Sequence, residues 1–246
     1  IQGFANYTRL LQDELVIGSI KNTLQFSLLS VPLGIIVALV LANILTQNIR
    51  GVGVYRVLYF LPMIAAPAAV TMVWRMIYNG QYGIINGILA NFGIAGPSWM
   101  SDPNLAMWSV IVIAAWSGLG QQIIILIAAI KGVSKTYYEA AAIDGAHGWH
   151  LFMNITLPMV SPSVFFLTVT GIINALRQFD IVYMMYYNTT NPAIDSVRTL
   201  MYEYYRQAFQ ANDKAYASAI VIFSFVIIMM FTGIQFIGQR KWVHYE

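Results

Sequence analysis

The stretch Tyr137–Pro162, YYEAAAIDGAHGWHLFMNITLPMVSP, decides the fold, because it is a polar, loop-like segment between two long apolar runs. Glu139–Ala141 predicts a short amphipathic helix, since alanine and glutamate are good helix formers. Gly145 ends this helix, because glycine readily takes the left-handed conformation of a C-terminal cap. A second amphipathic piece follows, with apolar side chains at helical spacing: Trp149, Phe152 and Ile155. We call residues 137–158 the elbow, and predict a bent segment between two membrane spans that another protein can grip.

Seven residues of the elbow stand at fixed spacing, and an Asp-Gly-Ala sequence lies among them. They are Glu139, Ala140, Ala141, Gly145, Ile155, Leu157 and Pro158, with Asp144 and Ala146 on either side of the glycine. This pattern resembles the coupling segment in the membrane subunits of type I ABC importers, where Glu-Ala-Ala, glycine and Ile-x-Leu-Pro follow at these spacings. Asp-Gly-Ala resembles the carbohydrate-uptake branch, which includes permeases for maltose, multiple sugars and glycerol phosphate. The alternative is an ordinary amphipathic linker helix.

The composition is that of a membrane protein. Of the 246 residues, 59% are hydrophobic and 9% are charged, whereas about a quarter are charged in soluble domains. Cysteine is absent, so disulfides and thiolate metal sites are excluded. The net charge of +3 is too small to suggest nucleic acid as a partner, and it fits lysine and arginine flanking membrane spans.

Five apolar runs are long enough to cross a hydrocarbon layer of roughly 30 Å, which takes about 20 helical residues. They are Asn22–Leu45, Val57–Tyr78, Leu105–Ile130, Met159–Tyr187 and Ala215–Gly238. We therefore predict an all-α integral membrane protein, with one transmembrane permease domain over residues 1–246 and the elbow between its third and fourth spans. The resemblance implies the type I ABC importer fold, with one further span before residue 1.

The charges beside the spans predict which way the chain faces. If the spans alternate, one side collects Arg50, Arg56, Lys131, Lys135, Arg240 and Lys241, together with the elbow. Cytoplasmic loops are enriched in such cations, so we expect this side to be cytoplasmic. The resemblance independently places the elbow in the bacterial cytoplasm, below the inner membrane. On the opposite side, residues 196–210 predict a surface helix at the membrane interface, with Tyr202, Tyr205 and Phe209 on one face.

The sequence contains no arrangement of residues that suggests catalysis. It lacks a G-x-x-x-x-G-K-[ST] phosphate loop and a G-x-S-x-G elbow, and its three histidines have no partner at metal-ligand spacing. We expect neither a metal site nor a cofactor in this chain. The resemblance implies that ATP and Mg²⁺ are bound by a separate ATPase subunit, and that this chain is a permease and not an enzyme.

Polar side chains within the third and fourth spans predict a path for a solute. The candidates are Gly118, Gln121, Gln122, Asn174 and Gln178. Polar groups inside a span usually face the bundle interior or a wet cavity, and amides offer both donors and acceptors to a neutral polyol. The alternative is that these amides only join helices together. The maltose-type permeases line their sugar site from these same two spans, which favours the path.

Arg177 has two possible roles. It lies three residues before Asp180, so on a continuous helix the two side chains can pair, and we favour this structural ion pair. The alternative is that Arg177 faces the path and favours an anionic solute, such as a phosphorylated or uronic sugar.

The resemblance implies import of a sugar by alternating access. The expected partners are a second, homologous permease, two ATPase subunits, an extracellular solute-binding protein and the bilayer. Glu139 would pair with a cation of the ATPase. A secondary transporter or channel independent of an ATPase stays an alternative, because it would also need midplane amides, although it would have no use for the elbow. A membrane-embedded enzyme is a second alternative.

Overall fold

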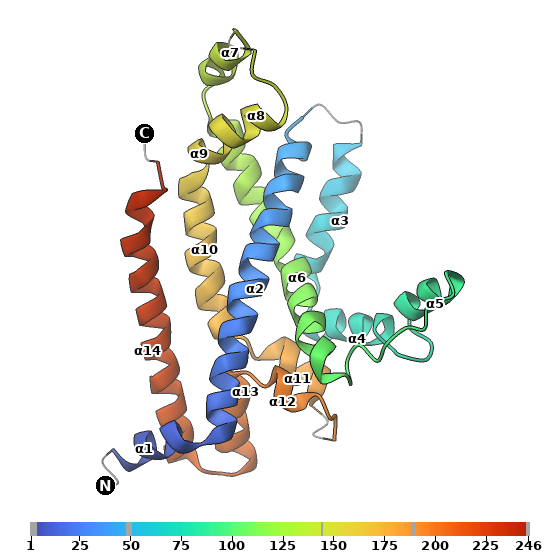
Figure 1. Ribbon diagram of the computed structural model, residues 1–246, viewed down its shortest axis with the longest axis vertical. Coiled ribbons are helices and arrows are strands. Elements are labelled where there is room, and N and C mark those ends of the chain that lie inside the picture. Colours follow the sequence, from blue (N-terminus) through green and yellow to red (C-terminus); the bar gives the residue numbers. More distant parts are fainter. Residues whose placement is uncertain (1–3, 48–50, 144, 188–189, 245–246) are drawn as a thin grey trace.

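The computed structural model describes residues 4–47, 51–143, 145–187 and 190–244 of the chain. Every regular element in these ranges is helical. Long helices lie side by side in a bundle, with the elbow and the C terminus at one end, which we call the elbow end (Figure 1). The N terminus lies at the other end, which we call the far end. The prediction of an all-α protein is confirmed.

Three helices can each cross a membrane by their length and apolar composition: α2 (Glu14–Leu45), α6 (Pro103–Gly132) and α14 (Lys214–Gly238). Two bent helix pairs raise the number of spans to as many as five, if each pair counts as one span. The helix α10 (Ser161–Leu176) belongs to the second of these pairs and packs against α2 and α14. The described residues therefore accommodate the five predicted spans, but two of the spans are broken.

Each of the three long helices begins with an aspartate cap at the far end (Figure 1). Asp13 accepts a hydrogen bond from the backbone N–H of Leu15 at 3.0 Å, and Asp102 accepts one from Asn104 at 2.9 Å. Asp213 caps α14 in the same way. The first N–H groups of a helix have no partner within it, so these caps fix where the three spans start.

The second predicted span, Val57–Tyr78, is not one helix. Instead α3 (Val52–Ile64) and α4 (Pro67–Ile77) meet at an angle of 106°. Ala65 and Ala66 between them are extended, with ψ of 140° and 138°. Pro67 explains the break, because a proline drives the preceding residue away from helical geometry. As a result, α4 packs across the bundle against α11 and does not continue α3.

The fourth predicted span, Met159–Tyr187, is also broken. α10 ends at Leu176, and α11 (Asp180–Tyr186) starts only after a non-helical turn. At its other end, the helical segment Trp149–Met159 meets α10 at 67°. The apolar composition of the run concealed the break after Leu176, whereas the bend before Ser161 lies where the predicted elbow leads into the span.

The prediction of a surface helix over residues 196–210 is confirmed for helical structure over residues 200–210, but it is wrong in placing the whole segment at the surface. That region folds as α12 (Ile194–Val197), α13 (Leu200–Tyr205) and the π-helix η2 (Arg206–Gln210). Tyr202 is 2% exposed, because α13 packs between α2 and α14. Glu203 of α13 is also fully buried, where it pairs with Arg198 and Arg206.

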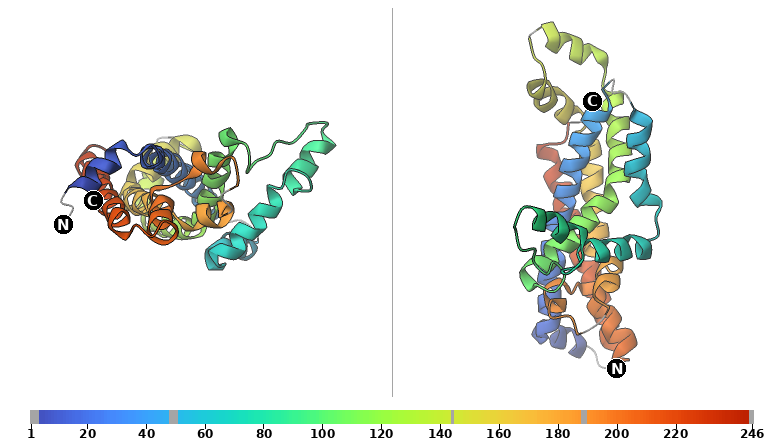
Figure 2. Two further views of the ribbon diagram at one scale, coloured as in Figure 1. Left: turned by 90° about the horizontal axis from the view of Figure 1, so that it is seen from below. Right: turned by 90° about the vertical axis from the view of Figure 1, so that its right-hand side faces the viewer.

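Shorter elements complete the fold. They are α1 (Ala5–Gln12), α5 (Ile84–Asn91), α7 (Lys135–Ile143), α8 (Trp149–Leu151), the π-helix η1 (Phe152–Thr156), α9 (Leu157–Met159) and the 3-10 turn η3 (Gln239–Lys241). Figure 2 shows that α4 and α5 extend away from the bundle as an arm. The predicted cytoplasmic cations Lys131 and Lys135 lie where α6 meets α7, at the elbow end, whereas Arg50 is outside the described residues.

Candidate solute path and coupling elbow

The first half of the elbow is a helix that ends in a glycine cap. The backbone N–H of Ala146 donates to the carbonyl of Ala141 at 2.9 Å, which is the six-to-one hydrogen bond of a Schellman motif. Gly145 has φ of +76°, the left-handed conformation that this motif needs. A second glycine, Gly148, has φ of +58° and turns the chain into α8. Gly145 and Gly148 therefore produce the bend in the elbow.

The surface of the elbow is uncovered by the rest of the chain. Figure 1 shows α7 beyond the end of the bundle. Glu139 and Ala140 are exposed, as are Ile143 at 87% and Trp149 at 68%, whereas Ala141 is buried. Asp144 lies outside the described residues. A surface with one carboxylate and large uncovered apolar groups is suited to a protein partner.

The second half of the elbow differs from the expected amphipathic helix. Phe152 is buried and Ile155 half-buried, whereas Trp149 points outward. The rings of Trp149 and Phe152 still lie side by side, with centroids 5.3 Å apart. The π-helix η1 begins at Phe152, and its wider turns shift the register of the side chains that follow. Leu157 and Pro158 are half-buried in α9, which leads into α10.

Both halves of the elbow meet at a hollow of about 380 Å³. Its lining includes four residues of the predicted motif: Ala141, Gly145, Ala146 and Ile155. The hydroxyl groups of Tyr138 and Thr156 lie 3.3 Å apart and also join the two halves. Three of the seven residues at fixed spacing thus line one hollow together with Ala146, whereas the other four do not line it.

A polar cavity of about 170 Å³ lies between α2, α6 and α10. It brings together five of the six predicted path residues: Gly118, Gln121, Gln122, Asn174 and Gln178. Ser30 and Phe26 of α2 line it too, although the sequence predicted path residues only in the third and fourth spans. The buried serines of α2 were the available signal, since a hydroxyl inside a span marks an interior face. The role of these residues in transport stays a prediction.

Gln122 has an unusual environment in this cavity. Its carbonyl oxygen Oε1 is buried without a hydrogen-bond partner. The side chain lies against two glycines, because a Cβ atom built on Gly34 would be 3.1 Å from Oε1 and one on Gly118 would be 3.3 Å from Nε2. A buried acceptor without a partner is costly, and no hydrogen bond among the described residues satisfies this one.

The predicted ion pair between Arg177 and Asp180 is absent. The ion pairs recorded among the described residues do not include either side chain, and both side chains are exposed. The break after Leu176 explains this, because two residues three apart face each other only on a continuous helix. Arg177 does not line the polar cavity.

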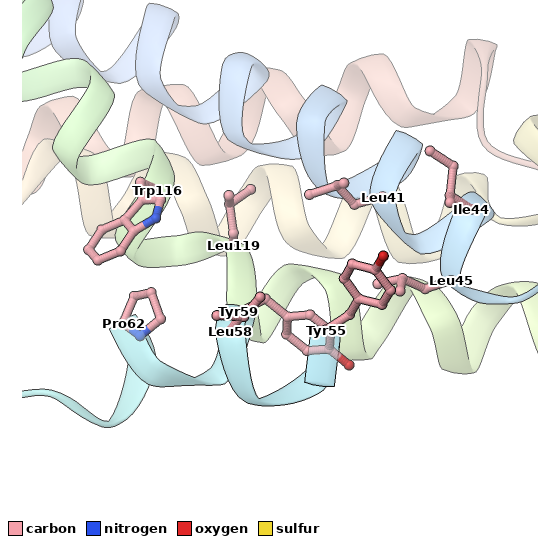
Figure 3. Close-up of a pocket in the computed structure, with 9 residues that line it drawn as sticks. All are labelled: Leu41, Ile44, Leu45, Tyr55, Leu58, Tyr59, Pro62, Trp116 and Leu119. Carbon is pink, nitrogen blue, oxygen red and sulfur yellow. The ribbon is translucent and has the colours of Figure 1, made fainter. Parts of the chain in front are cut away.

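A second cavity, of about 440 Å³, has a different chemistry. Figure 3 shows its lining side chains facing one another from α2, α3 and α6: Leu41, Ile44, Leu45, Tyr55, Leu58, Tyr59, Pro62, Trp116 and Leu119. Aliphatic and aromatic side chains offer few hydrogen bonds to a polyol. Although it is larger, this cavity does not fit the predicted solute.

The sequence places these features in a known family. Residues 30–244 match the family described as "binding-protein-dependent transport system inner membrane component". The chain belongs to this family. It is therefore a membrane-embedded permease of the ABC importer type, as the spacing of the elbow motif predicted.

Named relatives are similar to this permease over most of their length. The probable ABC transporter permease protein YesP of Bacillus subtilis is 36% identical over 95% of this chain and 75% of its own length. The sn-glycerol-3-phosphate transport system permease protein UgpA of Agrobacterium fabrum is 32% identical, with 99% and 82% covered. The trehalose/maltose transport system permease protein MalF of Thermococcus litoralis is 32% identical, with 94% and 77% covered.

Among solved structures, the permease shares its fold with a bacterial alginate ABC transporter. That structure contains an alginate pentasaccharide-bound periplasmic protein. The TM-score is 0.89 at 24% identity, and the match covers 97% of this chain and 83% of the other. The expected type I importer fold is confirmed.

Proposed function

We propose that this permease is one membrane subunit of an ATP-driven, binding-protein-dependent importer that moves a sugar into the bacterial cytoplasm by alternating access. The observation that carries the proposal is the position of the elbow in the chain. It connects α6 directly to α10, and these two helices supply four of the five predicted residues of the polar cavity, while Gln178 lies in the turn that follows α10. A force on the elbow therefore acts on both walls of the cavity.

The motor is a pair of separate ATPase subunits that bind ATP and Mg²⁺. The exposed carboxylate of Glu139 would pair with a cation in a cleft of the ATPase, while Ile143 and Trp149 supply apolar contact. Ala140 is small and exposed, which permits close approach of the α7 backbone. In this arrangement the elbow end faces the cytoplasm, below the inner membrane.

The remaining partners follow from the same arrangement. A second, homologous permease would complete the path, because the polar cavity has walls on only three helices of this chain. A solute-binding protein would deliver the sugar at the far end. A neutral sugar fits the amides of the cavity, because each amide both donates and accepts hydrogen bonds.

Affinity purification of the tagged permease from its native membrane tests this proposal. We expect an ATPase subunit to co-purify, and uptake into proteoliposomes to stop when vanadate blocks ATP hydrolysis. The Trp149→Ala variant should lose the ATPase subunit, whereas Phe225→Ala, which removes an exposed aromatic group of α14, should retain it. Uptake that continues in vanadate, without a bound ATPase, would instead establish a secondary transporter or channel.

A second candidate is an anionic sugar as the solute. The observation in its favour is that Arg177 is exposed beside Gln178 and is not paired with Asp180. The relative UgpA is named for sn-glycerol-3-phosphate. If the solute is anionic, Arg177→Gln should lower its uptake about tenfold, since a hydrogen bond to a charged group contributes about 1.5–3 kcal/mol. Arg177→Lys should retain most uptake. Equal loss of maltose and glycerol 3-phosphate uptake in Arg177→Gln would contradict charge selection.

A further inference from the structure

A buried cluster of charges lies at the far end, outside the polar cavity. The carboxylate of Glu203 is fully buried, and it accepts hydrogen bonds from Arg198 at 3.1 Å, Arg206 at 2.6 and 2.9 Å, and Gln207 at 2.8 Å. Arg198 also pairs with the exposed Asp195. Burying charges is costly even when they are paired, so such clusters are weak evidence for stability and are better explained by a need to fix one geometry.

The cluster is connected to α2, which forms one wall of the cavity. The side-chain amide of Asn22 donates to the backbone carbonyls of Asp195 and Arg198 at 2.7 and 3.1 Å. The hydroxyl of Thr23 accepts from the backbone N–H of Leu200 at 2.9 Å. Residues 195–200 are therefore held to the far end of α2.

The same segment holds the break between α10 and α11. The hydroxyl of Thr199, which is 1% exposed, donates to the backbone carbonyl of Gln178 at 2.8 Å. It also accepts from the backbone N–H of Tyr202 and so caps α13. A carbonyl released from a helix inside a membrane protein needs a substitute donor, and Thr199 is that donor for Gln178.

Aromatic contacts hold the other side of the break. The ring of Phe179, the residue after Gln178, is stacked on Tyr183 at a centroid distance of 5.0 Å and contacts Tyr205 at 5.2 Å. Tyr205 immediately precedes Arg206 of the charge cluster. Thr199 and Tyr205, which lie on either side of Glu203 in the sequence, thus contact Gln178 and Phe179, the two residues that shape this turn.

We propose that Thr199 is a positioning residue for the solute path: it transmits the geometry of the Arg198–Glu203–Arg206 cluster to Gln178 and thereby sets where the Gln178 side chain lies in the polar cavity. The cluster fixes the position of the Thr199 hydroxyl. The hydroxyl fixes the backbone turn at Gln178, and this turn determines where the side-chain amide of Gln178 lies. Only the part of this inference that concerns transport rests on the proposed function.

Cysteine labelling tests the positioning itself without any solute. Residues 1–246 contain no cysteine, so Gln178→Cys creates a single thiol within this sequence in the purified complex. We expect Thr199→Val to make this thiol react about fivefold faster with a maleimide, the change that loss of one typical hydrogen bond produces. Thr199→Ser should leave the rate unchanged. So should Ser196→Ala, which removes a hydroxyl bonded only to Ala193.

A cysteine on a different helix of the cavity distinguishes a specific effect on residue 178 from a general increase in the mobility of the cavity. Gln121→Cys lines the same cavity from α6, and its rate should not respond to Thr199→Val. Equal acceleration of both thiols, or of neither, would overturn the inference whatever the function of the cavity.

Uptake of maltose and glycerol 3-phosphate into proteoliposomes gives the functional readout. Thr199→Val should raise KM about fivefold with kcat little changed, and the effect should disappear in the Gln178→Ala background, where no amide remains to be positioned. An effect that persists there would overturn the inference. If Gln178→Ala alone leaves uptake unchanged, the role of the cavity in the proposed function fails, while the labelling result still decides the positioning.

Discussion

Replacing Gly145 with valine is expected to abolish uptake while the permease still inserts into the membrane. Gly145 has φ of +76°, and no atom lies within 4 Å of a Cβ built there. The added side chain therefore has room, and the cost falls on the backbone. For a β-branched residue in this conformation the strain is about 1–3 kcal/mol, which leaves up to about 100-fold fewer molecules with a bent elbow.

The matched controls for Gly145 separate backbone strain from charge. Gly145→Asn should keep most uptake, because asparagine tolerates the left-handed conformation. Gly145→Asp has nearly the same shape as asparagine but adds a negative charge to the surface that we propose meets the ATPase, so we expect it to lose uptake. Uptake of a labelled sugar and pull-down of the ATPase from the same membranes measure both effects. Wild-type uptake by well-expressed Gly145→Val and Gly145→Asp would contradict a coupling role for the elbow.

Removing the amide of Gln122 is expected to lower uptake about 10- to 100-fold, because an unpaired or lost hydrogen bond in a buried site costs about 1–3 kcal/mol. Gln122→Leu keeps most of the side-chain volume between Gly34 and Gly118. It removes the buried Oε1 acceptor. Basal ATP hydrolysis and binding of the ATPase should not change, since both depend on the elbow.

Gln235→Leu provides the control for Gln122. It makes the same chemical change on α14, where the amide donates to the carbonyl of Thr168 and does not line the polar cavity. Proteoliposome uptake by the two variants should therefore differ by at least about tenfold. Similar losses in both would indicate that these amides only join helices, the alternative raised by the sequence.

Local sequence was sufficient to predict the elbow but not all of the helix breaks. The bend at Gly145 depends on one residue and its neighbours, and the structure has it in the conformation that glycine favours. The break before Pro67 also depends only on neighbouring residues. It was not predicted, because the long apolar run around Pro67 favoured one continuous span. The break after Leu176 has no proline, and it is held by Thr199, which lies 21 residues away from Gln178.

The cavity and the charge cluster show where sequence reasoning ends. Amides within two spans pointed to a shared interior, because polar groups in a membrane avoid lipid. The contribution of Ser30 depends on how α2 packs against α6 and α10, which no local pattern encodes. The burial of Glu203 cannot be read from the sequence either, since it depends on three-dimensional pairing with Arg198 and Arg206.

In the proposed function, the place of the elbow between α6 and α10 also sets how deep the solute is held. At 1.5 Å per residue, Gln122 lies about 15 Å along α6 from Gly132, and Asn174 lies about 20 Å along α10 from Ser161. In a hydrocarbon layer of roughly 30 Å these depths are close to the middle. A sugar bound there is about equally far from both aqueous phases. Small movements of the helices at the elbow end or at the far end can therefore change which aqueous phase the sugar is exposed to.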